Sequence, residues 1–534
     1  MTAGSIPGRA RTLGSRSTPA LVVAASALAL WIIAAALASG RELVPYPWRV
    51  FTQVVADWSM LAPNIGYTLV GAGWGLLIGV AVVVPLAVVS LLAPILEPVI
   101  VRVAVVVHVI PLVAIAPILT VVLHGRGPQV TVAALTVYFP LLIPVLLGLH
   151  SGDRRTSDVV ATSGGGRWAQ LRYLRLPSAV PAFAAGLQVA VPSAILGALL
   201  GEFFGSEQGL GAVLVSAQQQ LLTDRTWGVA LVMGALAAAG YALVAVAVRV
   251  ALPWAGRGST VGTTVAGAED QVLTRRQSLV AGAVSLVLLL GFWQSLRPLF
   301  GLDGFFTKSP VDVLRFLANG NPGTGAGPEV FAHGFAGALA QTLLDAGVGF
   351  VAGTVLSVAV AVLFVSFPRV GAALMPFAIV LRSVPLVALA PLLTLVFGTG
   401  LLGVTVLVVL VTFFPTLVTV MTGLRATPNG AVEVVLASGG SSFAAAWRVR
   451  MYYAVPAISA SARVSIPGAI TGATLAEWLA TGHGVGNLLT LASVQADYLT
   501  LWTGGILIVL IALIAYGLVG VADTAISRRL GIRL

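Results

Sequence analysis

The chain has 534 residues, of which 58% are hydrophobic and only 9% are charged. Its apolar residues fall in runs of about 20, the length that crosses a bilayer, which excludes an ordinary soluble core. The net charge of +11 does not indicate nucleic-acid binding, because the arginines are scattered between apolar runs and form no single basic surface. There is no cysteine, which excludes disulfides, thiol catalysis and cysteine-ligated metals.

The first apolar run extends from Ala20 to Ser39 and follows three arginines, Arg9, Arg11 and Arg16. It is long for the apolar core of a signal peptide, so we expect a retained first helix. The small residues at 36–38 would also suit cleavage, and both alternatives stay open.

Charge-poor runs predict an all-α polytopic membrane protein with twelve transmembrane helices. The first six are expected at 20–39, 66–92, 98–123, 128–150, 179–201 and 227–249, and the second six at 278–296, 341–366, 371–396, 401–424, 455–477 and 500–522.

An internal repeat relates the two sets of helices. The stretch Ile110–Thr120 recurs as Val384–Thr394, 274 positions later, and beyond one inserted residue the offset becomes 275. Register kept over nearly the whole chain indicates a duplicated membrane unit. Six helices per unit is an even number, so the halves are expected to be parallel repeats. We expect the halves at 1–252 and 278–534, joined by a flexible linker at 253–277 that is rich in Gly, Ser, Thr and Ala.

Arginine placement predicts the orientation of these helices. With twelve spans, the arginine clusters near both termini, in the linker and in the segments 151–178 and 425–455 all fall on one side. Because Lys and Arg are enriched on the cytoplasmic side, both termini are expected to be cytoplasmic.

The segments 151–178 and 425–455 are longer than a simple connection between helices requires, which indicates that they bind something. An acidic residue is expected in the first turn of a short helix, where the helix dipole favours it, and a glycine six residues later would let the chain bend. An ordinary helix–glycine–helix connector is the alternative. The shared positions are Asp158, Ser163, Gly164 and Gly165 in the first copy and Glu433, Ser438, Gly439 and Gly440 in the second; Pro177 closes the first copy, where the second has Tyr452.

This pattern resembles the cytoplasmic loop of bacterial ABC-importer permeases, in which the loop forms a short helix seated in a groove of the ATPase subunit. The resemblance implies two copies of an ABC ATPase subunit, which would bind ATP and Mg, and an extracytoplasmic substrate-binding protein. It also implies a location in the bacterial cytoplasmic membrane.

The stretch Pro111–Pro117 and its copy Pro385–Pro391 resemble more specifically the permeases of nitrate, sulfonate and taurine importers. That resemblance implies a small organic or inorganic anion as the substrate, although similar permeases carry vitamin precursors.

The chain has no motif for ATP hydrolysis of its own. A P-loop requires Gly-x-x-x-x-Gly-Lys-Ser/Thr, and the only lysine, Lys308, follows Phe306 and Thr307. We therefore expect no cofactor in this chain, no catalytic activity of its own, and a separate protein as the motor.

Polar residues and prolines inside the spans are candidates for the translocation pathway. The arginines could attract an anion or could pair with carboxylates. The glutamates precede Gly-x-Gly and could form an outer gate or a structural pairing with a neighbouring outer loop. The prolines could line a cavity or only kink helices. These candidates are His108, Pro111, Pro117, Gln188, Glu202, Arg382, Pro385, Pro391, Arg463 and Glu477.

An ion-coupled secondary transporter is the alternative function, because parallel six-helix repeats also occur in that class. It would require acidic residues deep in the bundle, whereas most acids here lie in loops or near span ends. A membrane enzyme is less well supported, since no His or carboxylate cluster has the spacing of a catalytic or metal site.

Overall fold

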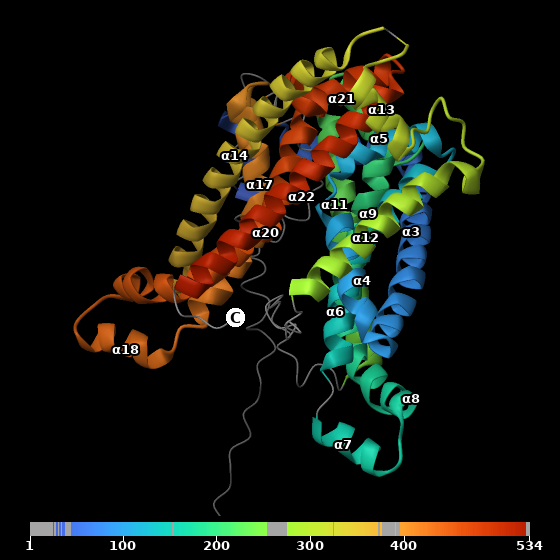
Figure 1. Ribbon diagram of the computed structural model, residues 1–534. Helices are drawn as coiled ribbons and strands as arrows, with labels where there is room; N and C mark the ends of the chain where they lie inside the picture. Colours follow the sequence, from blue (N-terminus) through green and yellow to red (C-terminus); the bar gives the residue numbers. More distant parts are fainter. Residues whose placement is uncertain are drawn as a thin grey trace, which may run out of the picture.

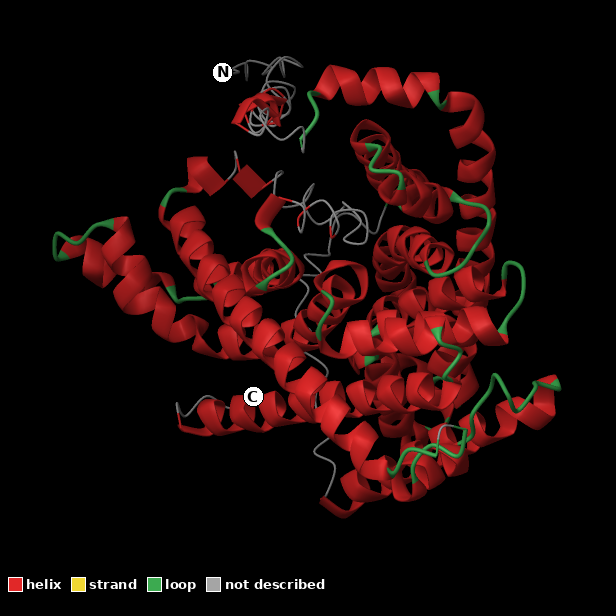
Figure 2. Ribbon diagram, turned by 90° about the horizontal axis from the view of Figure 1, so that it is seen from above, coloured by secondary structure: helices red, strands yellow, loops and turns green. Residues whose placement is uncertain are grey.

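The computed structural model describes residues 44–151, 154–253, 275–323, 325–371 and 396–529, together with isolated helical residues within 25–37 and 374–393. The described residues form helices and no strand (Figures 1 and 2). With the duplication seen in the sequence, this confirms the predicted all-α polytopic architecture.

The first half contains ten α-helices of the described chain, and two of them, α8 and α9, are joined by a π turn at Leu171–Arg175. The helices are α2 (Pro47–Ala56), α3 (Trp58–Leu92), α4 (Glu97–Val109), α5 (Leu112–Val122), α6 (Gly127–His150), α7 (Arg154–Thr162), α8 (Arg167–Gln170), α9 (Leu176–Phe203), α10 (Leu210–Gln219) and α11 (Thr223–Ala251).

The described part of the second half follows the same order apart from α4 and α5, whose equivalent positions lie mostly outside the described residues. It has a π turn at Ala446–Arg450 in the equivalent place and a further one at Glu477–Thr481. Its described helices are α12 (Arg275–Phe300), α13 (Pro310–Asn319), α14 (Pro328–Ser366), α17 (Leu401–Arg425), α18 (Asn429–Ala437), α19 (Ser442–Ala445), α20 (Met451–Ala476), α21 (Gly484–Val494) and α22 (Tyr498–Arg529).

Eight of the described helices are long and apolar enough to cross a membrane, or nine if α4 and α5 form one broken span. The predicted span at 98–123 was wrong as a single helix, because the chain bends by 95° between α4 and α5. The predicted span at 455–477 corresponds to α20, which is not among these eight. The predicted spans at 20–39 and 371–396, and the linker at 253–277, fall mostly outside the described residues.

Small residues let the long helices of each half approach closely. A Cβ added at Gly75 or Gly79 of α3 would collide with Ala133 or Val137 of α6. In the second half, Gly349 and Gly353 of α14 face Val408 and Thr412 of α17 in the same way. Glycines four residues apart are typical of helix contacts in membranes, where close van der Waals packing drives association.

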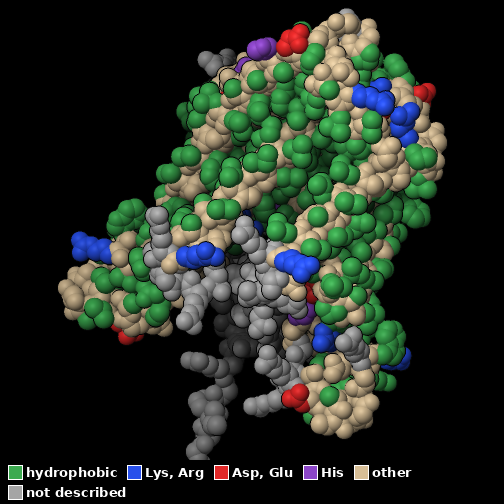
Figure 3. Space-filling view, viewed as in Figure 1, with side chains coloured by type: hydrophobic (Ala, Val, Ile, Leu, Met, Phe, Trp, Pro, Cys, Tyr) green, Lys and Arg blue, Asp and Glu red, His purple; other side chains and the backbone are tan. Residues whose placement is uncertain are grey.

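The outer surface of the long helices is apolar. Hydrophobic side chains cover their length, and charged side chains lie toward the two ends of the molecule (Figure 3). This is the distribution expected for helices surrounded by lipid.

The halves meet through α4 and α5: α4 contacts α12 and α22, and α5 contacts α20, α21 and α22. One apolar cluster joins Val109, Ala114 and Ile118 to second-half residues that include Ala469 and Leu489. The fold therefore places the broken helix of the first half against the second half.

Candidate functional site

Two short helices, α7 and α18, project at one end of the molecule, one from each half (Figure 1). We call them the coupling helices. The chain after each is bent by a glycine in the left-handed region, Gly164 at φ +78° and Gly439 at φ +81°. The next amide closes the helix end: Gly165 N–H donates to Val160 O and Gly440 N–H to Val435 O, each at 2.9 Å.

The bent glycine donates as well, Gly164 N–H to Ala161 O and Gly439 N–H to Leu436 O, each at 3.1 Å. Together with the bond from the next residue, this is the Schellman arrangement that satisfies the last carbonyls of a helix. Ser163 and Ser438 add a matching bond, since each hydroxyl donates to the carbonyl four residues earlier at 2.8 Å. The sequence prediction of a helix with a glycine bend is confirmed in both copies.

The predicted place of the acidic residues within these helices was wrong. Because α7 begins at Arg154 and α18 at Asn429, Asp158 and Glu433 are each the fifth residue, one turn beyond the helix start. The effect of the helix dipole falls off within the first turn, so it does not explain these acids. Both side chains are exposed, where they can meet a partner.

Exposed apolar side chains accompany the acids. Val159 and Val434, at equivalent positions, are 63% and 66% exposed; Trp168 and Phe443, also equivalent, are 66% and 51% exposed. The sequence analysis missed these four residues, although comparing the two copies would have shown an apolar residue directly after each acid. Large apolar side chains exposed on a charged end of the molecule indicate a protein contact.

A π turn links each coupling segment to the long helix that follows it, at Leu171–Arg175 and at Ala446–Arg450. Such turns are uncommon and occur often at functional sites. Pro177 follows the first and Tyr452 occupies the equivalent position after the second, so the proline is not required for the turn.

At the opposite end of each half, a buried glutamate joins three helices. Glu202 Oε2 accepts hydrogen bonds from Thr68 Oγ1 at 2.9 Å and Gly211 N–H at 3.0 Å, and Leu210 N–H donates to Thr68 Oγ1 at 3.1 Å. Asn64 Oδ1 accepts a further bond from the loop amide of residue 209 at 2.7 Å.

The second half contains the same junction. Glu477 Oε2 accepts from Thr342 Oγ1 at 2.8 Å and Gly486 N–H at 2.9 Å, and Val485 N–H donates to Thr342 Oγ1 at 2.9 Å. Both glutamates are 1% exposed. These contacts give Glu202 and Glu477 a structural pairing, one of the two roles considered from the sequence.

The interior candidates of the first half lie around the break between α4 and α5. His108 is exposed and stacks on Phe139 of α6, with ring centroids 4.1 Å apart. Pro111 is the residue before α5 and Pro117 lies within it; both are buried, and Gln188 on α9 is partly buried. Of these four candidates, only His108 presents an exposed side chain.

Arg463 on α20 interacts with α22. Its guanidinium lies 5.1 Å from the ring centroid of Tyr516 and 3.9 Å from Asp523 Oδ2. Of the two roles considered for Arg463 from the sequence, attraction of an anion and pairing with a carboxylate, these contacts favour the pairing. Arg382, Pro385 and Pro391 lie outside the described residues.

An aromatic contact joins the two halves beside the glutamate junctions. Phe204, two residues after Glu202, packs edge to face on Trp478, the residue after Glu477, with centroids 5.0 Å apart. Each partner is thus fixed by its own junction, and the contact couples the two halves at this end.

Comparison with known proteins matches the chain twice to one family, described as "Binding-protein-dependent transport system inner membrane component", over residues 86–257 and 353–530. A "Probable ABC transporter permease protein" of Haemophilus influenzae is 28% identical over 43% of this chain and 89% of its own length. The "Riboflavin transport system permease protein RibX" of Chloroflexus aurantiacus is 28% identical over 46% of this chain and 88% of its own.

A shorter match is to the "Formylaminopyrimidine transport permease protein ThiX" of Halalkalibacterium halodurans, 29% identical over 24% of this chain and 50% of that protein. No solved structure gives a significant match. The first two relatives are aligned over nearly their whole length but over less than half of this chain, which is consistent with two fused copies of their unit.

Proposed function

The chain belongs to the family of binding-protein-dependent transport system inner membrane components, and we propose that its coupling helices transmit ATP hydrolysis by separate ATPase subunits to the membrane helices. It is the permease part of an ABC importer. Two ATPase copies bind α7 and α18 on the cytoplasmic side, where both termini also lie. Their closing and opening exposes the pathway alternately to the outside and to the cytoplasm.

The duplicated coupling helices carry this proposal. They are exposed, end in the same glycine bend, and present an acidic side chain followed by an apolar one at equivalent positions. The first copy has Asp158 and Val159 and the second has Glu433 and Val434. Two similar surfaces on one chain suit two copies of one partner, and the permease supplies no ATP-binding motif of its own.

The substrate proposal has two forms. The resemblance to nitrate, sulfonate and taurine permeases favours a small anion, but Arg463 is engaged with Tyr516 and Asp523. The named relatives act on riboflavin and formylaminopyrimidine, which favours a planar nitrogen heterocycle. The stack of exposed His108 on Phe139 offers aromatic surface for such a ring, and we favour the heterocycle. Thermal shifts of the cognate binding protein with nitrate, taurine, riboflavin and pyrimidines distinguish the two.

Co-purification tests the coupling proposal. The tagged chain in mild detergent is expected to retain an ATPase, and Trp168→Glu with Phe443→Glu is expected to lose most of it, because each change places a charge in an apolar contact. Gln220→Glu, an exposed position at the opposite end of the molecule, is the control. Retention of the ATPase by the double variant would refute the assigned docking surface, and its absence from the native chain would refute the proposed function.

A further inference from the structure

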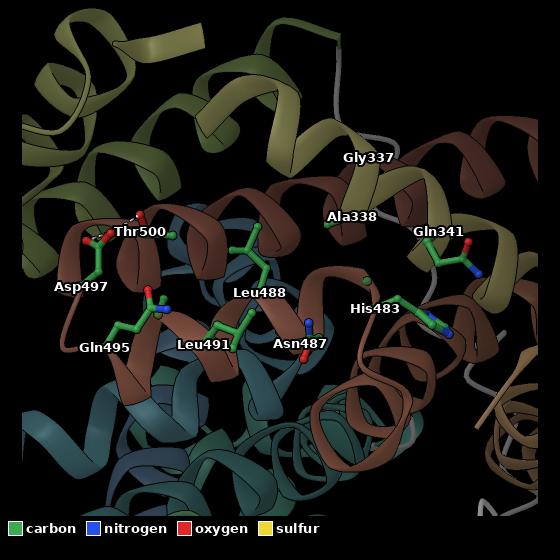
Figure 4. Close-up of a pocket in the computed structure, with 12 residues that line it drawn as sticks. Gly337, Ala338, Gln341, His483, Asn487, Leu488, Leu491, Gln495, Asp497 and Thr500 are labelled. Carbon is green, nitrogen blue, oxygen red and sulfur yellow. Dashed lines mark hydrogen bonds between the residues drawn. The ribbon is translucent and has the colours of Figure 1, made fainter. Parts of the chain in front are cut away.

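The second half contains a cavity of about 560 Å³ at the end of the molecule opposite the coupling helices. Asp497 and Thr500 lie at one end of it and Gln341 and His483 at the other, with Leu488 and Leu491 between them (Figure 4). We call it the acidic pocket. The described residues that line it include no lysine or arginine.

One carboxylate, that of Asp497, lines this pocket, and a second, that of Asp345, is buried beneath the lining. Asp497 is partly exposed and accepts hydrogen bonds from Thr500 Oγ1 at 2.8 Å and Asn321 Nδ2 at 3.2 Å, both neutral donors. Lys308 acts electrostatically on Asp497, but its ammonium donates to a backbone carbonyl, Gly304 O, at 3.0 Å. Within the described chain, no ion pair links Asp497 to a cation.

The second carboxylate lies beneath the other end. Asp345 is fully buried; its Oδ1 accepts from Gln341 Nε2 at 3.1 Å, and its Oδ2 lies 3.9 Å from His483 Nδ1 and accepts no hydrogen bond among the described residues. Glu477 also lies close enough to act on Asp345 electrostatically. Among the described residues, His483 is therefore the one titratable base that faces the buried pair of Asp345 and Glu477.

The equivalent surface of the first half has a different character. By the repeat, Leu222 replaces Asp497, and Arg225 replaces Thr500. Arg225 is already paired with Asp57, with Nε 2.7 Å from Oδ2. The position of Asp345 is a glycine, Gly71, in the first half.

Side-chain size differs as well. Asn64 and Tyr67 occupy the positions of Ala338 and Gln341. Asn64 is bonded to the loop amide of residue 209, and the ring of Tyr67 is covered by the guanidinium of Arg126 at 4.3 Å. In the first half, larger side chains that already form contacts thus occupy the positions that line the pocket in the second half.

We propose that the acidic pocket receives a lysine or arginine side chain from one lobe of the extracytoplasmic binding protein, so that this protein docks on the fused permease in one orientation. The proposal rests on the proposed function, which places the pocket on the outer side. Asp497, which forms no ion pair within the described chain, attracts a basic side chain by charge complementarity. The first half has Leu222 and an arginine already paired with Asp57 at the matching positions, so it presents no carboxylate at the place of Asp497.

The test uses the binding protein that stimulates ATP hydrolysis by the complete complex in nanodiscs. Its affinity for the complex is measured with Asp497→Asn, which keeps an acceptor at the start of α22. A matched control, Glu207→Gln, removes one exposed carboxylate from the first half. Asp497→Asn is expected to weaken binding about fivefold and to reduce its salt dependence, whereas Glu207→Gln leaves both unchanged.

A second measurement maps the orientation. A photo-reactive benzophenone residue at Gln495 is expected to capture a peptide with an exposed Lys or Arg from one lobe, and the same residue at its counterpart Gln220 is expected to capture the other lobe. Equal affinity of Asp497→Asn and the native chain, or capture of both lobes at each position, would overturn the proposal. If no binding protein stimulates ATP hydrolysis by the native complex, the proposed function itself fails.

Discussion

At the scale of single residues, the two buried glutamates connect helices that would otherwise be held only by apolar contacts. Glu202 and Glu477 each accept one side-chain and one backbone hydrogen bond. A backbone amide left buried without an acceptor is costly, and Gly211 and Gly486 would be left so without these carboxylates.

Replacing either glutamate by alanine is therefore expected to destabilise the chain. The free energy of unfolding should fall by about 1–3 kcal/mol, because a buried amide loses its acceptor. Thermal unfolding in detergent, followed by tryptophan fluorescence, measures the change for Glu202→Ala and Glu477→Ala. Glu207→Ala, which changes an exposed glutamate in the loop after α9, is the control. A melting temperature equal to that of the control would show that the junctions are not structural.

A second residue-scale contact depends on pH. Asp57 lies just before α3, and the hydrogen bonds from Arg225 hold its pKa below the ordinary carboxyl value, against the opposing effect of burial. A group whose pKa is lowered by folding stabilises the folded state above its unfolded pKa, and this contribution disappears as the pH falls through the folded pKa.

The native chain is thus expected to be more thermally stable than Asp57→Asn at neutral pH. The difference should narrow as the pH falls below about 4. Melting temperatures between pH 7 and pH 3 test this, with Glu207→Gln as the control that shows no such narrowing. A difference that stays constant over this range would contradict the assigned role of the ion pair.

At the scale of elements, the glycine bends after the coupling helices allow the sharpest test. Gly164→Val and Gly439→Val place a β-branched residue at a positive φ, which costs of the order of 1–3 kcal/mol and alters the helix end. ATP hydrolysis by the complex is expected to become uncoupled from transport. Gly166→Val and Gly430→Val are matched controls, because both positions have open space and lack a positive φ.

Comparison of ATP hydrolysis with and without the binding protein measures this coupling. The control variants should retain stimulation by the binding protein and the two test variants should lose it. Stimulation that survives in Gly164→Val and Gly439→Val would show that the bends are not required for coupling.

The sequence predicted the coupling helices, because acid and glycine recur at a fixed spacing in both copies. It misplaced Asp158 and Glu433 within them, since the helix start depends on how the preceding span ends. It also missed the π turns, which carry no residue signature: Pro177 has no counterpart in the second copy. The bend between α4 and α5 is signalled by Pro111, but its size depends on packing against the second half.

At the scale of the whole molecule, hydropathy and the repeat were sufficient for the fold class, because the bilayer imposes both the length and the polarity of a span. They were insufficient for contacts between the halves. Asp345 stands near the start of the predicted span at 341–366, yet it is fully buried. Its pairing with His483 joins segments far apart in the sequence, and the first half has Gly71 and Gln208 at the equivalent positions.

The contact between the halves also gives a prediction for the transport cycle. The chain has no cysteine, so Phe204→Cys with Trp478→Cys introduces the only two thiols. A short bis-thiol cross-linker is expected to join them without ATP and to block transport, because these side chains are in contact. Trapping the complex with vanadate should reduce the cross-linking, and equal cross-linking in both states would contradict movement at this contact.

The most direct test of the central claim is substrate uptake by proteoliposomes that contain the purified chain, its ATPase and its binding protein. An ABC importer is expected to give uptake that requires ATP and all three proteins, that ionophores leave unchanged, and that Gly164→Val with Gly439→Val abolishes. Uptake by the chain alone, driven by a proton or sodium gradient and indifferent to ATP, would contradict ABC import and indicate a secondary transporter.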